Sequence, residues 1–169
     1  AVYDHQLDAF TMLDRATAHV EPDAAGGSAT DATATRMILV RGQKTLKLEE
    51  NAKIVGEIQT LTSNTATLSF TEDEGAIKYL ELRGAARATP NPGGPPDRPA
   101  MSADNITMSF YEDGLTLQHA ALTGRAVLDL SGGAARSIRA SWIDLFTARD
   151  GRTLTRLQAD ADRADVEVD

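Results

Sequence analysis

Short runs of alternating apolar and polar residues recur along the chain. In Ala66–Phe70 (ATLSF) and Ile106–Phe110 (ITMSF) every second side chain is apolar, the pattern of a strand that buries one face. Stretches that contain Asp and Gly follow these runs and recur near residue 150: Glu72–Gly75, Glu112–Gly114 and Arg149–Gly151. Asp and Gly tolerate the positive φ angles of tight hairpin turns. The pattern therefore predicts β-hairpins.

The second strand of each hairpin is predicted to return along Ile77–Thr89, Leu115–Leu130 or Thr153–Val168. Gly84 and Gly124 stand in the middle of the first two of these strands. A glycine inside a strand marks a bulge, a bend or a close approach of two backbones. We therefore expect the return strands to bend at these glycines.

The hairpin pattern repeats. Leu61–Pro90 aligns with Met101–Leu130 without a gap at a spacing of 40 residues, and weaker copies occupy Ile138–Val168, Ala1–Pro22 and Thr33–Gly56. Such a period indicates stacked units, each unable to bury its apolar face alone. The sequence predicts one domain of about five hairpins, approximately 1–22, 33–57, 61–90, 101–130 and 138–168, with no helix. Walls about 25 Å tall follow if each hairpin places one strand in each of two walls.

Longer connections separate the repeats. Pro22–Thr33, Pro90–Ala100 and Ser131–Ser137 are rich in Gly, Pro, Ala and Ser, and are predicted to be loops. They fall at the same phase of the repeat, so we expect them along one rim and the Asp-Gly turns along the other. The last predicted strand, Asp162–Asp169, alternates apolar and charged residues. It either protects a sheet edge from aggregation or docks a partner by β-augmentation.

Composition excludes several classes of protein. The chain has no cysteine, which excludes disulfides and thiolate metal sites. Its net charge of −8 opposes a nucleic-acid interface, which needs a clustered basic face. The longest apolar runs, such as Met37–Val40, are too short to cross a bilayer. The first residues already lie inside a repeat, so we expect the chain to be part of a longer protein.

Catalytic and metal-binding patterns are not evident. His5, His19 and His119 fall in different repeats without metal-ligand spacing. The acidic residues of Glu72–Glu74, with Glu112 and Asp113, stand in predicted turns. Acids from neighbouring turns would have to converge to cleave a glycosidic bond, whereas Asp and Glu beside glycine commonly shape the turn. We expect no catalytic residue, metal or cofactor.

One pattern connects three of the repeats. It consists of small and polar residues at the start of a strand, an apolar strand, and a return strand that contains Leu-x-Gly. It is carried by Ser102–Phe110 with Leu122–Val127, by Ser63–Phe70 with Leu82–Arg87, and by Leu48–Ile54. In this pattern the chain resembles the OstA-like group of periplasmic lipopolysaccharide-transport proteins, LptA and LptC, over nearly its whole length. The connection Pro90–Ala100 is longer than that family's usual ones, and an LptC-type membrane anchor would lie outside this chain.

The resemblance implies an all-β fold, an open antiparallel β-jelly roll that is V-shaped in cross-section. It implies a periplasmic trough that carries the acyl chains of lipopolysaccharide or a related glycolipid. It also implies like-folded Lpt partners, joined edge to edge by β-augmentation, or self-association. Two alternatives remain: a ligand-free β-solenoid scaffold that polymerises as bactofilins do, and a polysaccharide-active β-helix enzyme.

The trough lining is expected from the inward members of the alternating strands. These residues are Leu68, Phe70, Ile106, Met108, Phe110, Leu117, Leu128, Ile143 and Leu145. The same residues suit an ordinary dry core. Trp142 is expected at the mouth of the trough or on the outer face of the sheet. Six basic residues either face lipid phosphates at the opening or lie on the solvated face: Lys44, Lys47, Lys53, Arg83, Arg87 and Arg125.

Overall fold

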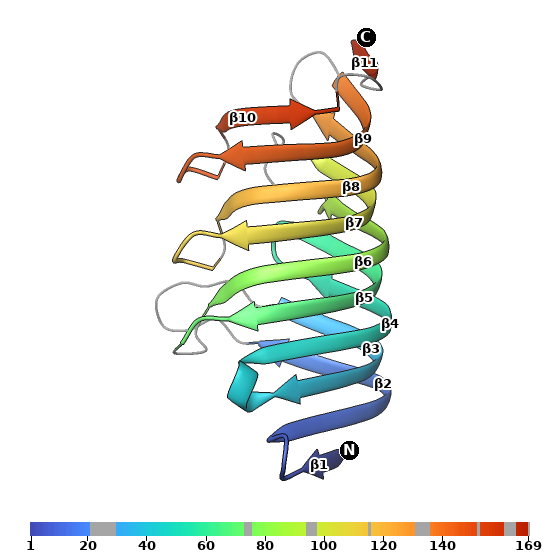
Figure 1. Ribbon diagram of the computed structural model, residues 1–169, viewed down its shortest axis with the longest axis vertical. Helices are drawn as coiled ribbons and strands as arrows, with labels where there is room; N and C mark the ends of the chain where they lie inside the picture. The colour runs from blue at the N-terminus through green and yellow to red at the C-terminus, as the bar shows by residue number, and fades with distance from the viewer. Residues whose placement is uncertain are drawn as a thin grey trace.

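The protein is one long antiparallel sheet. The computed structural model describes residues 1–20, 30–72, 76–93, 98–114, 116–130, 136–151, 153–160 and 165–168. Its strands are β1 (Val2–Asp4), β2 (Ala9–Val20), β3 (Thr30–Val40), β4 (Thr45–Val55), β5 (Gln59–Phe70), β6 (Ile77–Pro90), β7 (Ala100–Phe110), β8 (Leu117–Leu130), β9 (Arg136–Thr147), β10 (Leu154–Ala159) and β11 (Asp165–Val168). Strands β1 to β10 lie side by side in chain order, and β11 pairs with β9 (Figure 1). The all-β prediction is confirmed; among the described residues, the helical exception is the 3-10 turn η1 (Arg41–Gln43).

The predicted hairpins are present. In the turn between β7 and β8, the Tyr111 N–H donates to the Thr116 carbonyl at 2.9 Å. The Asp113 carboxylate accepts from the Thr116 N–H at 2.8 Å, and Gly114 has φ +65°. The turn between β9 and β10 has the same form, with Gly151 also at φ +65°. The third predicted turn, at 72–75, lies mostly outside the described residues.

Each strand from β2 to β9 crosses both walls of the molecule. The register shifts near the middle of every pair from β2–β3 to β8–β9. At these shifts, alternate strands carry two successive residues with φ between 50° and 77°: Asp14 and Arg15, Glu50 and Asn51, Gly84 and Ala85, Gly124 and Arg125. The bulges align into one fold line, where the sheet turns back on itself (Figure 1).

This arrangement corrects the predicted division of the walls. Each wall consists of half of every strand, and not of alternate strands. The reason is that sequential strands pair with one another on both sides of the fold line, as in β5 with β6 at Leu68↔Leu80 and again at Leu61↔Ala88. Ten neighbouring strands make a wall about 45 Å tall, not 25 Å. Strands β5 and β7 correspondingly begin well before the alternating runs at Ala66 and Ile106.

Gly84 and Gly124 are required by the fold line. A Cβ on Gly124 would lie 2.9 Å from the Cβ of Asp104 on β7, and one on Gly84 would lie 3.0 Å from the Cβ of Asn64 on β5. Both glycines also have positive φ, which a side chain disfavours. The bends expected at these two residues are confirmed.

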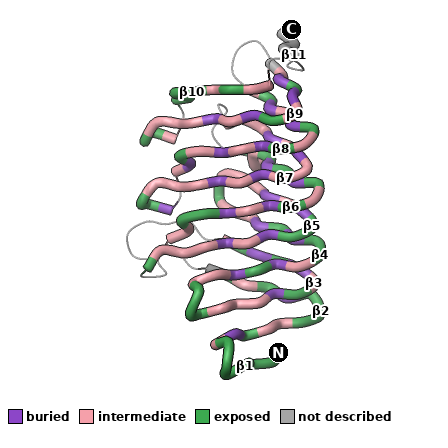
Figure 2. The backbone as a smooth tube through the Cα atoms, viewed as in Figure 1, coloured by how far each residue is buried: buried purple, intermediate pink, exposed green. Residues whose placement is uncertain are grey.

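Side chains decrease in size towards the fold line on one wall. On the first wall a row of cross-strand neighbours runs Met37, Leu48, Ala66, Leu82, Ile106, Leu122 and Ile143. Directly across the fold line the second wall carries buried small residues: Ala16, Ala34, Ala52, Ser63, Ala86, Ala103, Ala126 and Ala140. Small residues fit there because the two walls meet at the fold line and leave little depth between them. In Figure 2, buried and more exposed residues alternate along the strands accordingly.

The two strand ends form two rims that flank the mouth opposite the fold line. The strand ends joined through residues 5–8, 41–44, 71–76, 111–116 and 148–153 lie along the first rim. The strand ends at Val20 and Thr30, Val55 and Gln59, Pro90 and Ala100, and Leu130 and Arg136 lie along the second rim. The strand ends that flank the predicted tight turns and those that flank the predicted long connections therefore lie on opposite rims. Two predicted loops are too long: β3 begins at Thr30 and β9 at Arg136, so Pro22–Thr33 and Ser131–Ser137 both end within strands. Residues 21–29, 94–97 and 131–135 lie outside the described part of the chain.

The two ends of the sheet differ. At the N-terminal end, β1 covers only residues 9–11 of β2. At the C-terminal end, β10 and β11 pair with the two halves of β9 on either side of its bend. The predicted edge strand Asp162–Asp169 corresponds to β11, while residues 161–164 and 169 are outside the described residues. Both ends present sheet edges.

Candidate functional site

The nine residues predicted to line the trough all occupy the space between the two walls. Seven are buried: Leu68, Ile106, Met108, Leu117, Leu128, Ile143 and Leu145. Phe70 and Phe110 are partly buried and pack against this core. Together they belong to one continuous hydrophobic cluster that extends from β2 to β10.

Depth divides these residues into two groups. Ile106, Met108 and Ile143 have no exposed surface and fill the interior on the side towards the fold line. Phe110 pairs in register with Leu117 beside the turn 111–116, and so lies near the mouth. Access from solvent therefore begins at the strand ends.

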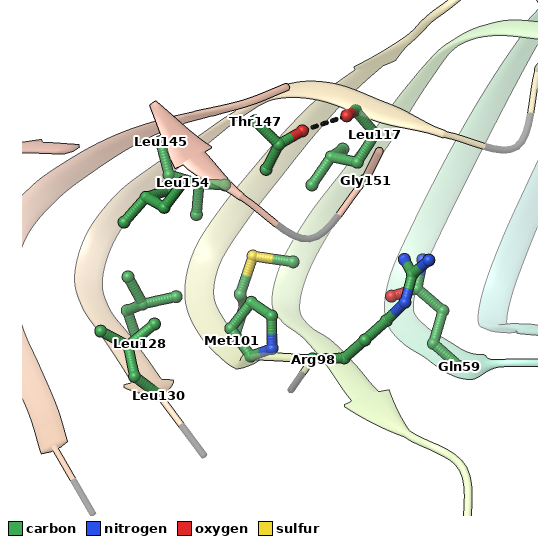
Figure 3. Close-up of a pocket in the computed structure, with 11 residues that line it drawn as sticks. Gln59, Arg98, Met101, Leu117, Leu128, Leu130, Leu145, Thr147, Gly151 and Leu154 are labelled. Atoms are coloured by element: carbon green, nitrogen blue, oxygen red, sulfur yellow. Dashed lines mark hydrogen bonds between the residues drawn. The ribbon is translucent and has the colours of Figure 1, made fainter. Parts of the chain in front are cut away.

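Two apolar cavities lie at the mouth. The first, about 60 Å³, is lined by Met101, Leu128 and Leu130 from the second wall and by Leu117 and Leu145 from the first (Figure 3). The second, about 80 Å³, is lined by Leu61 from the second wall and by Leu68, Leu80 and Phe110 from the first. Gln59 borders both cavities. The cavities are therefore neighbours along the mouth, and both walls contribute to each.

The cavities are small. A cavity that binds benzene in another protein measures about 150 Å³, and an acyl chain is larger than benzene, so a full acyl chain enters either space only with movement of the walls. Five of the nine predicted residues line these cavities: Leu68, Phe110, Leu117, Leu128 and Leu145. The other four, Phe70, Ile106, Met108 and Ile143, are not among the lining residues.

Sequence reasoning missed most of the second wall. Among the nine predicted residues, only Leu128 comes from it, whereas Leu61, Met101 and Leu130 line the cavities from the same side. For Leu61 and Met101 the reason is a change of phase at the fold line. In β7 the inward residues are 101 and 103 on one side of the fold line and 106, 108 and 110 on the other. Apolar residues three positions apart, such as Ala103 and Ile106, are the sequence signal that would have located this change of phase.

Charged side chains on the outer faces pair with one another. Arg36 Nη1 lies 3.1 Å from Glu49 Oε2, and Arg125 Nε lies 3.0 Å from Asp104 Oδ1 beside the fold line. Five of the six basic residues considered as phosphate contacts are exposed on this outer surface: Lys47, Lys53, Arg83, Arg87 and Arg125. These five side chains therefore lie on the solvated face of the sheet and not at the mouth.

Lys44 is the sixth of these residues and lies on the first rim. Its ammonium donates to the Glu72 carboxylate at 2.8 Å and also to the Glu72 carbonyl. The hydrogen bond and charge of Lys44 lower the pKa of Glu72. This ion pair connects the turn 41–44 to the start of the next turn along the rim.

The remaining polar candidates lie outside the interior. Trp142 is exposed on the outer face of β9. His119 Nε2 lies 3.1 Å from Asp144 Oδ1 and stacks on Phe146, also on an outer face. Asp113 and Asp150 shape the backbone of their turns by accepting hydrogen bonds from the N–H groups of Thr116 and Thr153. No three His, Cys, Asp or Glu side chains of the described segments gather as a metal site would require.

Comparison with solved structures identifies the fold. LptH, described as the LptA homologous periplasmic component of the conserved lipopolysaccharide transport device from Pseudomonas aeruginosa, superposes with a TM-score of 0.55 at 13% sequence identity. The match covers 99% of each chain. This chain has the LptA-like fold. The predicted open β-jelly roll is thereby confirmed.

Comparison at the level of sequence assigns the chain to no family. No protein-family model matches the chain, and no curated protein matches it. Among the described residues there is no helix with the length and apolar character to cross a membrane.

Proposed function

We propose that this protein is a periplasmic carrier that passes lipopolysaccharide or a related glycolipid along its interior as one element of a bridge between membranes. The observation that carries the proposal is a single folded sheet whose apolar interior opens along one side, with cavities shared by both walls. The likeness to LptH, a component of such a transport device, supports the choice of cargo.

The physical basis of carriage is burial of hydrocarbon. Each methylene removed from water contributes about 0.8 kcal/mol, so partial insertion of several acyl chains offsets their extraction from a membrane. The cavities mark the places where insertion begins, and the walls separate about the fold line as chains enter. The sugar and phosphate parts of the lipid remain outside, between the rims. Transfer of this kind breaks no covalent bond and needs no catalytic residue.

A bridge requires contact between successive carriers. The edge of β2 beyond Thr11 has no strand partner among the described residues, and Leu7 and Leu13 beside it are 65% and 51% exposed. An unpaired edge flanked by exposed apolar side chains suits addition of another strand. We place a like-folded neighbour, either a second copy or another Lpt component, at the two sheet ends.

Photo-crosslinking tests the carrier directly. A photoreactive amino acid replaces Phe110, at the mouth, or Tyr79, which is 39% exposed on the outer face of β6. We expect irradiation of cell envelopes to join lipopolysaccharide to the position-110 variant but not to the position-79 variant. Equal labelling at both positions, or none at position 110, contradicts the proposal.

A second candidate is the ligand-free scaffold. It is favoured by the tight filling of the interior, where Met37, Leu48, Leu82 and Ile106 have 1% exposure or less. A scaffold would assemble end to end and yet take up no hydrocarbon. Assembly without crosslinking from the mouth would therefore select the scaffold over the carrier.

A further inference from the structure

Arg98 crosses the mouth beside the first cavity. It lies two residues before β7 in the connection 91–99, and so belongs to the second rim. A Cβ built on Gly151, in the turn 148–153 of the first rim, would lie 3.8 Å from Nη2 of Arg98. The side chain of Arg98 is thus close to both rims. Arg98 and Gln59 both line the first cavity (Figure 3), and Gln59 also lines the second.

The space beneath Arg98 is apolar. Met101, Leu128 and Leu130 face Leu145 and Leu154 across the cavity. Among its described lining residues, Arg98 is the one that carries a charge, and Gln59 and Thr147 supply the polar side chains. The Thr147 hydroxyl donates to the Leu117 carbonyl. The Arg98 guanidinium and the Gln59 amide supply the other polar side-chain groups of the lining.

This combination selects a particular ligand chemistry. A guanidinium has five N–H donors in a planar arrangement that matches the oxygens of phosphate or carboxylate, so it binds such a group while keeping a protein contact. A methylene chain attached directly to that oxyanion would point into the apolar cavity. The net charge of −8 on the whole chain repels anions elsewhere. Attraction for an anion at the mouth therefore depends on local cations.

We propose that Arg98, with Gln59, forms a head-group subsite at the mouth that binds the oxyanion of an acidic lipid and directs the adjoining hydrocarbon into the first cavity. The inference rests on the proposed carrier function and narrows its cargo to lipids with a phosphate or carboxylate next to the acyl region. A neutral amphiphile of equal chain length gains burial of the tail but lacks the charge-assisted hydrogen bonds.

Three probes, titrated calorimetrically, separate the contributions of head group and hydrocarbon tail: dodecyl phosphate, the neutral monolaurin, and inorganic phosphate. The two amphiphiles are used below their micelle concentrations. We expect the protein to bind dodecyl phosphate about tenfold more tightly than monolaurin, and inorganic phosphate far more weakly than either. The Met101 methyl resonance is expected to shift with dodecyl phosphate, because Met101 lines the cavity. Higher salt reduces the preference.

Substitutions test whether the preference for dodecyl phosphate over monolaurin depends on Arg98. Arg98→Gln is expected to remove the tenfold preference for dodecyl phosphate over monolaurin, and Arg98→Lys to keep part of it. Arg87→Gln is the matched control, since it removes the same charge from the exposed outer surface of β6, and it is expected to keep the full preference.

The outcomes distinguish the two proposals. If the protein binds neither amphiphile, the carrier function and this subsite both fail. If it binds both with equal affinity, or if Arg98→Gln leaves the preference intact, the subsite is wrong and the carrier remains. If inorganic phosphate binds as tightly as dodecyl phosphate, the site takes a free oxyanion and the lipid head-group assignment is overturned.

Discussion

At the scale of single residues, a few backbone conformations decide where the sheet folds. Gly124 combines a φ of +75° with a neighbouring side chain so close that an added Cβ would clash with Asp104. Gly84 repeats this environment one hairpin earlier. Other positions on the fold line, such as Asp14 and Asn51, reach positive φ with side chains that tolerate it.

Substitution of Gly124 by alanine tests this requirement. The added Cβ meets both an unfavourable φ and the Asp104 side chain, so we expect Gly124→Ala to lower the free energy of unfolding by about 1–3 kcal/mol. Gly42 is a matched control, because a Cβ there meets no atom within 4 Å and its φ is not positive. Gly42→Ala is expected to change the stability by less than about 1 kcal/mol. Urea denaturation measures both; equal losses would refute the argument.

The Lys44–Glu72 pair predicts a pH effect on the first rim. Lys44 lowers the pKa of Glu72 in the folded protein, so the pair stabilises the fold above the unfolded-state pKa of Glu72. That contribution is lost as the pH falls through the lowered folded-state pKa. We expect Lys44→Gln to raise the Glu72 pKa towards its ordinary range, as measured by carboxyl NMR titration. Lys47→Gln, on the exposed outer face, should leave that pKa in place; an unchanged value in Lys44→Gln would contradict the assignment.

At the scale of elements, each strand from β2 to β9 is two half-strands that meet at the fold line. The halves bury opposite phases of the sequence in β5, β7 and β9, and this is why one period of two does not describe a whole strand. Beside the bulges, alanine predominates on the second wall, as in the cross-strand pairs Ala86↔Ala103 and Ala126↔Ala140. Their small size allows the walls to converge.

Enlarging one of these alanines should force the walls apart. Ala126 is 1% exposed, so Ala126→Leu adds volume where the interior is shallowest, and we expect a loss of about 1–3 kcal/mol in stability. Ala121 lies on the outer face of the same strand, opposite Thr107 and Asp144. Ala121→Leu is expected to be nearly neutral. Thermal unfolding of both variants measures the difference, and a tolerated Ala126→Leu would show that the walls are already separate there.

At the scale of the whole molecule, the fold has two open sheet ends and one open side. Hydrogen bonds connect neighbouring turns along the first rim. The Arg41 N–H donates to the Asp8 carbonyl at 3.1 Å, and the Tyr111 hydroxyl donates to the Thr147 carbonyl at 2.8 Å. On the opposite rim, the Asn91 amide donates to the Gly56 carbonyl at 2.8 Å. Opening of the mouth therefore involves movement of connected rims and not of single turns.

Assembly at the N-terminal end is testable through its exposed leucines. The double substitution Leu7→Lys and Leu13→Lys places two positive charges beside the open edge of β2, so we expect it to weaken end-to-end self-association at least tenfold. Sedimentation velocity over a concentration series measures this. Tyr79→Lys adds a charge to the middle of the outer face and is expected to leave association unchanged. Loss of association in Tyr79→Lys alone would place the contact on the outer face.

Much of the local structure is predictable from sequence. Alternation in Ala66–Phe70 and Ile106–Phe110, the Asp-Gly turns and the mid-strand glycines specify hairpins, turns and bends, because each depends on interactions between residues close in the chain. The gapless alignment of Leu61–Pro90 with Met101–Leu130 specifies stacking of like units. The sequence by itself therefore determined the class of fold and the identity of much of its interior.

Only the tertiary structure decided how the two walls are made and what meets across the mouth. Bulges on neighbouring strands align only when the strands pair, and that alignment assigns each half-strand to a wall and Met101 to the same cavity as Leu145. The position of Arg98 over that cavity likewise joins residues more than forty positions apart. Such neighbours are brought together by the folding of the whole sheet, which no local pattern encodes.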